Sequence, residues 1–171
     1  MAFSQITGFL GSGRANYHMQ GARSTTLSDL MQGPVVLVGI FGNPWTQRVT
    51  DPLRFHFVGG GASPAPYIAD RKNSASHYAI ELEAAPGSER DYAIVGRVYN
   101  TAAGQVSMIV AGLDAPGTTA ASEFITSPGD LVYLLKQLGR NSSAENIEAL
   151  ISVQVIGGKP GAPGFIQCQT N

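Results

Sequence analysis

Two stretches of the chain, residues 39–46 and 112–119, combine glycines with helix-capping residues, and each follows a run of apolar residues. In an α/β sheet, such stretches lie where a strand ends and a helix begins. Glycines there let a ligand approach the backbone, and the first helical turn offers unpaired N–H groups to an anion. We therefore expect a crevice for a polar or anionic small molecule if the two strands are neighbours. The predicted lining residues are Gly39, Gly42, Asn43, Trp45, Thr46, Gly112, Gly117, Thr118 and Thr119.

The two stretches do not specify a ligand. Neither matches G-x-G-x-x-G or G-x-x-x-x-G-K-[ST], and neither contains a lysine. Their glycines and caps therefore also fit tight turns that hold no ligand. Trp45, the sole tryptophan, is either a stacking platform for a ring-shaped ligand or an apolar anchor for the helix that begins there.

Asp70 and Arg71 are two charged residues that we also place beside the crevice. They follow an extended stretch at residues 66–68, which prolines keep from becoming helical. In one interpretation they line a polar pocket and contact the ligand. In the other they form an ion pair or a hydrogen bond within the loop.

No catalytic residue, metal site or cofactor motif is predicted. His18, His56 and His77 are far apart in the sequence and form no H-x-H or H-x-x-x-H pair. There is no G-x-S-x-G motif, and Cys168, the only cysteine, lacks a local nucleophile signature. A small hydrolase or transferase with an unrecognised site stays open only as a secondary alternative.

Composition and charge limit the classes of partner. The 171 residues include 11 basic and 12 acidic side chains, for a formal net charge of -1. No cluster of Lys or Arg forms a stripe that could follow phosphates, so this segment is not expected to bind nucleic acid. The start lacks a signal-peptide pattern, and no apolar run reaches the roughly 18 residues of a membrane span. We expect a chain that is soluble as written, with its compartment undecided and its abrupt start typical of a fragment.

Periodicity predicts the elements that position the candidate residues. Residues 35–38 are a continuous apolar run, typical of a central strand covered on both faces, and the mostly apolar residues 106–111 are a second candidate for a central strand. Asn43 and Pro44 predict the start of a helix that runs to about residue 50. Thr118 or Thr119 is expected to cap the helix after the second run. Helices are also predicted over residues 2–10 and 128–138, a helical turn over 24–31, and a strand over 17–22.

The middle and the end of the chain read as strands joined by turns. Residues 53–111 are expected to be rich in antiparallel hairpins, with turns at 59–61 and 85–88. Strands at 149–156 and 164–169 flank a turn at 157–161. We expect one α/β domain over residues 1–171, in which residues 1–13 form a peripheral helix and linker. The predicted fold is a three-layer, Rossmann-like or flavodoxin-like mixed sheet with an antiparallel, hairpin-rich portion.

Four segments, residues 33–46, 53–55, 91–95 and 111–124, resemble an uncharacterised α/β domain of acidobacterial-type proteins. The similarity runs from about residue 14 to the end of the chain. In those proteins the domain often lies C-terminal to a winged-helix DNA-binding domain and a membrane segment. The resemblance implies a regulatory or sensory output domain without assigned catalytic residues. A weaker likeness, in the pattern A-G-x-x-x-x-G-T-x-A-A, is to domains of archaeal surface-layer proteins and implies a structural part.

The sequence therefore favours a noncatalytic ligand-sensing or protein-interaction module that belongs to a larger bacterial regulatory system. The main alternative is a structural or self-associating domain, in which an edge strand or an apolar face contacts a second copy or another protein.

Overall fold

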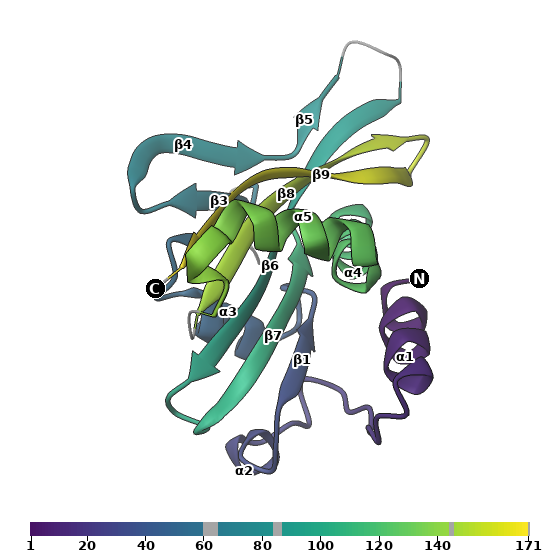
Figure 1. Cartoon of the computed structure of the whole chain (residues 1–171). Helices are drawn as coiled ribbons and strands as arrows, with labels where there is room; N and C mark the ends of the chain where they lie inside the picture. Colours follow the sequence, from purple (N-terminus) through teal and green to yellow (C-terminus); the bar gives the residue numbers. More distant parts are fainter. Residues whose placement is uncertain (60–64, 84–86, 144–145, 171) are drawn as a thin grey trace.

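Two β-sheets lie at the centre of the structure, a computed structural model that describes residues 1–59, 65–83, 87–143 and 146–170 (Figure 1). The larger sheet has six strands. In spatial order these are β1 (Val35–Val38), β7 (Gln105–Gly112), β6 (Ser88–Asn100), β8 (Ile147–Ile156) and β9 (Lys159–Thr170), with β5 (Glu81–Leu82) paired to β6. Among the described pairs of this sheet, only β1 and β7 run parallel.

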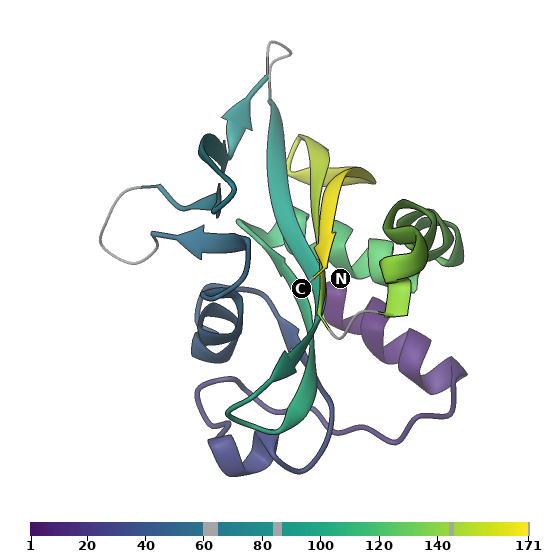
Figure 2. The ribbon, with the colours of Figure 1, turned by 60° about the vertical axis from the view of Figure 1, so that its left-hand side comes forward.

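The second sheet and the helices cover the two faces of the larger sheet. The second sheet is antiparallel, in the order β2 (Phe55–Val58), β3 (Tyr67–Asp70) and β4 (Asn73–Ala79). It shares one face with α3 (Pro44–Thr50), whereas α1 (Ala2–Ser12), α4 (Ala115–Thr126) and α5 (Pro128–Leu138) lie on the opposite face (Figure 2). The short α2 (Leu27–Leu30) precedes β1, and a 3-10 turn (Gly139–Ser143) follows α5.

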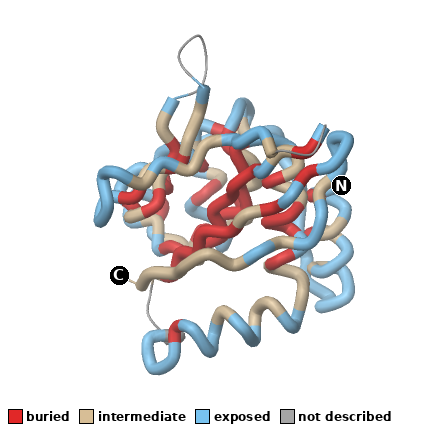
Figure 3. Tube along the Cα trace, turned by 90° about the horizontal axis from the view of Figure 1, so that it is seen from above, coloured by how far each residue is buried: buried red, intermediate tan, exposed pale blue. Residues whose placement is uncertain are grey.

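Alternation along the strands places apolar side chains on both faces of the larger sheet. In β6, Ile94 belongs to the core that includes Phe55 of the second sheet. Its neighbour Val95 belongs to the core that includes Phe124 of α4. Successive side chains of a strand point to opposite faces, so one strand supplies both cores. Figure 3 shows the buried residues concentrated along these strands, whereas α5 is mostly exposed.

The predicted mixed α/β sheet with an antiparallel, hairpin-rich portion is confirmed. The Rossmann-like or flavodoxin-like topology is not shown, because the larger sheet is mostly antiparallel. Those topologies need successive crossovers between parallel strands. Here a crossover of this kind runs from β7 through α4 and α5 to β8, which lies on the other side of β6 and is parallel to β7, whereas β6–β7 and β8–β9 are hairpins.

The prediction that residues 35–38 form a central strand is wrong. Their strand, β1, lies at the end of the sheet and pairs only with β7 among the described strands. Its continuous apolar sequence has another cause. Val35 and Leu37 pack in the core on the side of α3, and Val36 and Val38 pack on the side of α1 and α4. Both faces of β1 are therefore covered, although its second edge pairs with no strand that the structure describes.

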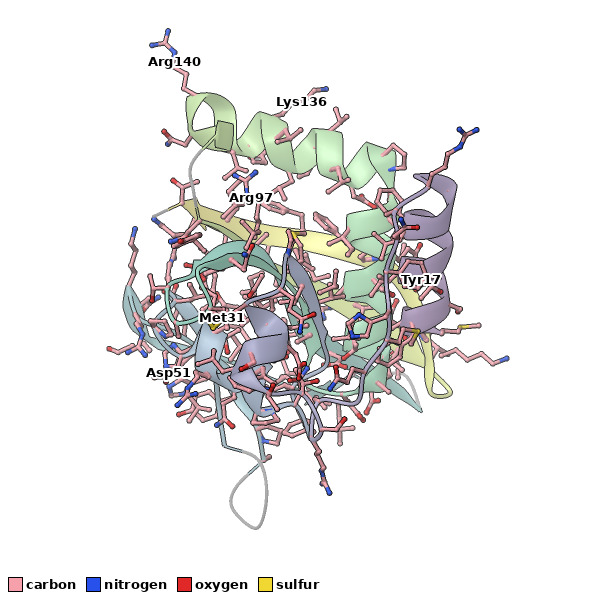
Figure 4. The ribbon with its side chains drawn as sticks, turned by 90° about the horizontal axis from the view of Figure 1, so that it is seen from below. Tyr17, Met31, Asp51, Arg97, Lys136 and Arg140 are labelled. Carbon is pink, nitrogen blue, oxygen red and sulfur yellow. The ribbon has the colours of Figure 1, made fainter. Side chains whose placement is uncertain are left out.

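The strand predicted over residues 17–22 is also wrong, because these residues form no strand and lie in the stretch between α1 and α2. Figure 4 shows Tyr17 on this stretch. Tyr17 and Met19 are 48% and 60% exposed, so the alternating pattern buries no apolar face.

The predicted caps of α4 are wrong as well, since α4 begins at Ala115 and not after Thr118 or Thr119. Asp114 caps the helix, and its side chain accepts a hydrogen bond from the backbone N–H of Ala115. The hydroxyls of Thr118 and Thr119 donate to carbonyls one turn back in the chain. Threonine makes this bond inside a helix, so its presence does not mark a helix start.

Several other elements match their predictions. Asn43 caps α3 with Pro44 at the first helical position, and α5 spans residues 128–138 as predicted. The turn over residues 24–31 contains α2, capped by Thr26. The last hairpin turns more tightly than predicted, at Gly157 and Gly158, whose positive φ angles of 57° and 74° suit glycine. Most of the predicted turns at 59–61 and 85–88 lies outside the described residues.

Candidate functional site

The two predicted loops begin side by side, because their strands are neighbours. β1 and β7 are parallel, with Val38 beside Val110, and the backbone N–H of Gly39 donates to the carbonyl of Val110 over 2.9 Å. This adjacency was the condition for a shared crevice. A ligand can bind only where the polar groups of these loops are not already hydrogen-bonded within the protein.

The second loop, residues 112–119, is closed by hydrogen bonds within the chain. Thr118 Oγ1 accepts a hydrogen bond from the N–H of Gly112 over 3.0 Å and donates one to the carbonyl of Asp114 over 3.1 Å. The carboxylate of Asp91, from β6, lies under the first turn of α4 and is 1% exposed. Its Oδ2 accepts from the N–H groups of Gly117 and Asp114 over 2.7 and 3.2 Å. The anion that this helix start would attract is therefore a side chain of the protein itself.

The two glycines of this loop allow close contacts, Gly117 with Asp91 and Gly112 with the backbone of Gly117 and Thr118. A Cβ on Gly117 would lie 2.6 Å from Asp91 Oδ2, and a Cβ on Gly112 would lie 2.3 Å from the backbone nitrogen of Thr118. Burial raises the pKa of Asp91, although its three backbone N–H donors act in the opposite direction. A buried carboxylate with a raised pKa also occurs in active sites. Asp91, however, is enclosed and fully bonded, so its structural role accounts for its position.

The first loop, residues 39–46, is only partly used by the protein. Gly39 and Gly42 adopt positive φ angles of 74° and 77°, and nothing lies within 4 Å of a Cβ added to either. The side chain of Asn43 accepts from the N–H of Thr46 and donates to the carbonyl of Val38, both over 3.3 Å. Thr46 itself is fully buried, and its hydroxyl has no hydrogen-bond partner among the described residues.

Thr46→Val should stabilise the protein by about 1 kcal/mol, because it removes an unpaired buried hydroxyl and keeps the shape of the side chain. Urea denaturation of the two proteins measures the difference. Thr50→Val is the matched control, since the Thr50 hydroxyl donates to the carbonyl of Thr46 over 2.9 Å, and its loss should destabilise the protein. A destabilised Thr46→Val protein would show that this hydroxyl has a partner.

Asp70 and Arg71 lie away from both loops and are bound within the protein. Arg54 holds Asp70 in a bidentate ion pair, with Nε to Oδ1 and Nη2 to Oδ2 both 2.7 Å. Arg71 donates to the backbone carbonyls of Leu53 and Asp51. No hydrogen bond or ion pair among the described residues joins Asp70 or Arg71 to residues 39–46 or 112–119. Asp70 thus pairs with Arg54, and none of the described bonds joins Asp70 to Arg71; within its own loop, Asp70 accepts the backbone N–H of Lys72 over 2.9 Å.

A carboxylate that the sequence did not single out completes this cluster. Glu148 of β8 is 2% exposed, and its two oxygens accept the backbone N–H groups of Arg54 and Phe55, each over 3.0 Å. Burial raises the pKa of Glu148, whereas hydrogen bonds from Arg54 lower the pKa of Asp70. Arg54, Asp70 and Glu148 thus fasten the second sheet to the larger one. The available signal was the single charged residue in the mostly apolar run at 147–156.

Two neighbouring hollows meet at Trp45 and form the candidate site. The edge hollow, of about 210 Å³, lies against β1, with Phe3 of α1 on one side and Trp45 of α3 on the other. The arginine hollow, of about 450 Å³, is lined by Ala22, Arg23, Thr25, Pro44, Trp45 and Arg48. Both hollows are bounded on the outside by the stretch that connects α1 to α2, the stretch that carries Tyr17 in Figure 4. Of the predicted site residues, Asn43 and Trp45 line these hollows.

Trp45 connects the walls of the two hollows. Its indole N–H donates to the carbonyl of Thr25 over 3.1 Å and so ties α3 to the stretch before α2. The guanidinium of Arg48 lies 5.9 Å from the centre of its ring. Trp45 also packs against the core, as the anchor interpretation required, yet it is only partly buried. Both interpretations of this tryptophan therefore remain compatible with its position.

The two hollows differ in charge. Arg23 and Arg48 are exposed, and neither forms an ion pair with any residue that the structure describes. In the edge hollow, Asp29 is already engaged, because it accepts hydrogen bonds from the backbone N–H and the hydroxyl of Thr26, each over 2.7 Å. These bonds hold the pKa of Asp29 below its usual value. Asp29 therefore stays ionised in the edge hollow, whereas the arginine hollow carries the two positive charges of Arg23 and Arg48.

Arg23 and Arg48 were not predicted as site residues. Neither belongs to a recognised motif, and Arg23 lies far from Trp45 in the sequence, in a stretch without regular structure. Arg48 carried a weak signal, since it lies about one turn beyond Trp45 on the predicted helix and so on the same face.

The structure offers no arrangement for metal chemistry in its described parts. No group of three or more His, Cys, Asp or Glu side chains gathers there in a way that could hold a metal ion. His77 packs its ring against Tyr67, at 4.8 Å between centroids, and burial raises the pKa of the Cys168 thiol.

No helix of the described chain has the length and apolar character to cross a membrane.

Comparisons with family models, curated proteins and solved structures give no match to this chain.

Proposed function

We propose that the chain is a noncatalytic binding module whose ligand lies against Trp45 in the two hollows. The observation that carries this proposal is the pair of arginines, Arg23 and Arg48, beside a partly exposed tryptophan in an open hollow. Neither has an anionic partner in the described parts of the chain. The ligand is a polar small molecule or peptide that brings an anionic group to the arginine hollow.

The chemistry of the hollow favours a carboxylate or a phosphate. The guanidinium group is a planar fork of N–H donors that matches both anions. Trp45 adds a flat apolar surface beside the charges, on which a planar part of the ligand can stack. Both hollows together reach the size of small-molecule pockets, which measure ~300–1,000 Å³.

A sensing role follows from the way Trp45 joins two parts of the chain. The bond from its indole to Thr25 holds the stretch before α2 against α3. A ligand that binds more tightly when this bond is made would shift the chain towards the closed arrangement. On this proposal the module reports the ligand to the remainder of a bacterial regulatory system.

Arg48→Gln is expected to weaken binding of an aromatic anion about tenfold, because it removes a charge-assisted hydrogen bond. Isothermal titration calorimetry with benzoate, phenyl phosphate, nucleoside monophosphates and inorganic phosphate measures the effect. Arg140→Gln is the matched control, since Arg140 is exposed on the turn after α5 and points away from the molecule (Figure 4). The proposal fails if none of these compounds binds, or if both variants weaken binding equally.

A further inference from the structure

The free edge of β1 lies in the wall of the edge hollow. β1 pairs only with β7 among the described strands, and all of its residues, Val35 to Val38, line this hollow. An edge strand presents N–H and C=O groups that a further strand can pair with. The hollow reaches both faces of the sheet at this edge, from Phe3 on one side to Trp45 on the other.

The register of β1 determines which backbone groups point outward. The N–H of Gly39 donates to Val110, so the backbone groups of Leu37, two residues earlier, also face β7. Those of the intervening residues, Val36 and Val38, face the hollow. The carbonyl of Val38 accepts from Asn43 Nδ2. The N–H and C=O of Val36 and the N–H of Val38 remain without partners among the described residues.

The outer wall of the hollow does not pair with this edge. The stretch between α1 and α2 contributes His18, Gln20 and Thr25 to the lining, but no described main-chain hydrogen bond joins it to β1. Its described bonds run to Trp45, to α1 and α2, and within itself, as from Gln20 to the carbonyl of Ser24. Space therefore remains between this stretch and β1.

The positive charge of the arginine hollow indicates what kind of ligand the edge hollow binds. The edge hollow and the arginine hollow share Ala22, Thr25 and Trp45. A chain lying along β1 therefore continues past Trp45 towards Arg23 and Arg48. A carboxylate at that point would meet two arginines that have no ion-pair partner in the described structure. The sheet edge and the charges thus favour the same kind of ligand.

We propose that the ligand of this site is an extended, carboxylate-bearing peptide that adds to β1 as a further strand and places its carboxylate in the arginine hollow. This inference rests on the proposed function and specifies its ligand. Main-chain hydrogen bonds to Val36 and Val38 hold the peptide, as in other cases of strand addition. Successive side chains of the peptide face Phe3 and Trp45 in turn, which favours apolar residues in both sets of positions.

A library of random hexapeptides with free C-terminal carboxylates tests the proposal on the full chain, with the same library amidated as the comparison. The selected peptides are then N-methylated at one backbone nitrogen at a time. Binding should weaken about tenfold when a nitrogen that faces β1 is methylated and remain unchanged at the alternating nitrogens, because only one set donates to the edge. Arg48→Gln should weaken the acidic peptides about tenfold, and Arg140→Gln should not.

The outcomes separate this inference from the proposed function. If the carboxylate of the selected peptides is C-terminal, amidation abolishes binding; if it belongs to Asp or Glu, binding survives amidation and is lost on change to Asn or Gln. Either result supports the inference. It is overturned if the library yields no binder, or if binding is unchanged both by loss of the carboxylate and by N-methylation at every position. If phenyl phosphate still binds beside Trp45 in that case, the proposed function holds although this inference fails.

Discussion

Gly112→Ala should lower the free energy of unfolding by about 3 kcal/mol, at the upper end of the cost of overpacking a core. The added Cβ would lie 2.3 Å from the backbone nitrogen of Thr118 and 2.4 Å from the carbonyl carbon of Gly117. Backbone atoms cannot rotate away as a side chain can, so the loop and α4 must shift together. That shift would also break the bonds that hold the carboxylate of Asp91.

Urea denaturation of the purified variants measures this loss. Gly8→Ala is the matched control, because Gly8 lies within α1 and nothing is within 4 Å of its added Cβ. Alanine there should stabilise the helix by about 1 kcal/mol. If Gly112→Ala unfolds at the same urea concentration as the unmodified protein, the loop at residues 112–118 is not packed as described.

Arg54→Ala should destabilise the protein by about 3 kcal/mol, the range found when one partner of a buried ion pair is removed. Asp70, which is 3% exposed, would lose its bidentate partner, and Glu148 would lose a nearby positive charge. The comparison is Arg90→Ala, which breaks the 2.8 Å pair with Glu83 at the surface. That change should cost less than about 1 kcal/mol.

The pH dependence of the Arg54→Ala cost identifies its origin. Hydrogen bonds from Arg54 hold the pKa of Asp70 below its ordinary value of 3.8. The stability from this pair is therefore complete above about pH 4 and is lost as the pH falls through the lowered pKa. Urea denaturation at pH 7 and at pH 3 should show a smaller cost of Arg54→Ala in acid. An equal cost at both values would mean that packing, and not the ion pair, is lost.

Asp91 and Glu148 change the stability of the fold with pH in the opposite direction to Asp70. Burial raises the pKa of each, so the folded protein binds protons that the unfolded chain has already released. Their contribution to stability therefore decreases as the pH rises above the ordinary carboxyl range.

Local signals in the sequence predicted much of the fold. Asn43 with Pro44 identified the start of α3, and the spacing of leucines identified α5, because caps and helical periodicity act within a few residues. A crevice shared by the two loops required that β1 and β7 be neighbours, and the two strands do pair. The edge position of β1 was not predictable from its own sequence, since Val35–Val38 is apolar on both faces for reasons that lie in α1, α3 and α4.

The candidate site was predicted less well, because its parts come from distant segments. Asn43 and Trp45 line it, whereas Gly112, Gly117, Thr118 and Thr119 belong to a neighbouring loop that binds Asp91. A carboxylate on β6 that caps a helix after β7 leaves no local pattern. Arg23 reaches the site only because the hydrogen bond from Trp45 to Thr25 brings its stretch against α3.

Trp45 itself supplies the most direct test of the account, because it is the only tryptophan and its emission reports on the site alone. Titration with benzoate and phenyl phosphate should change that emission to a saturating value, with a midpoint about tenfold higher in Arg48→Gln and unchanged in Arg140→Gln. An emission that neither compound changes, or midpoints that shift equally in the two variants, would contradict a binding site between Trp45 and its arginines.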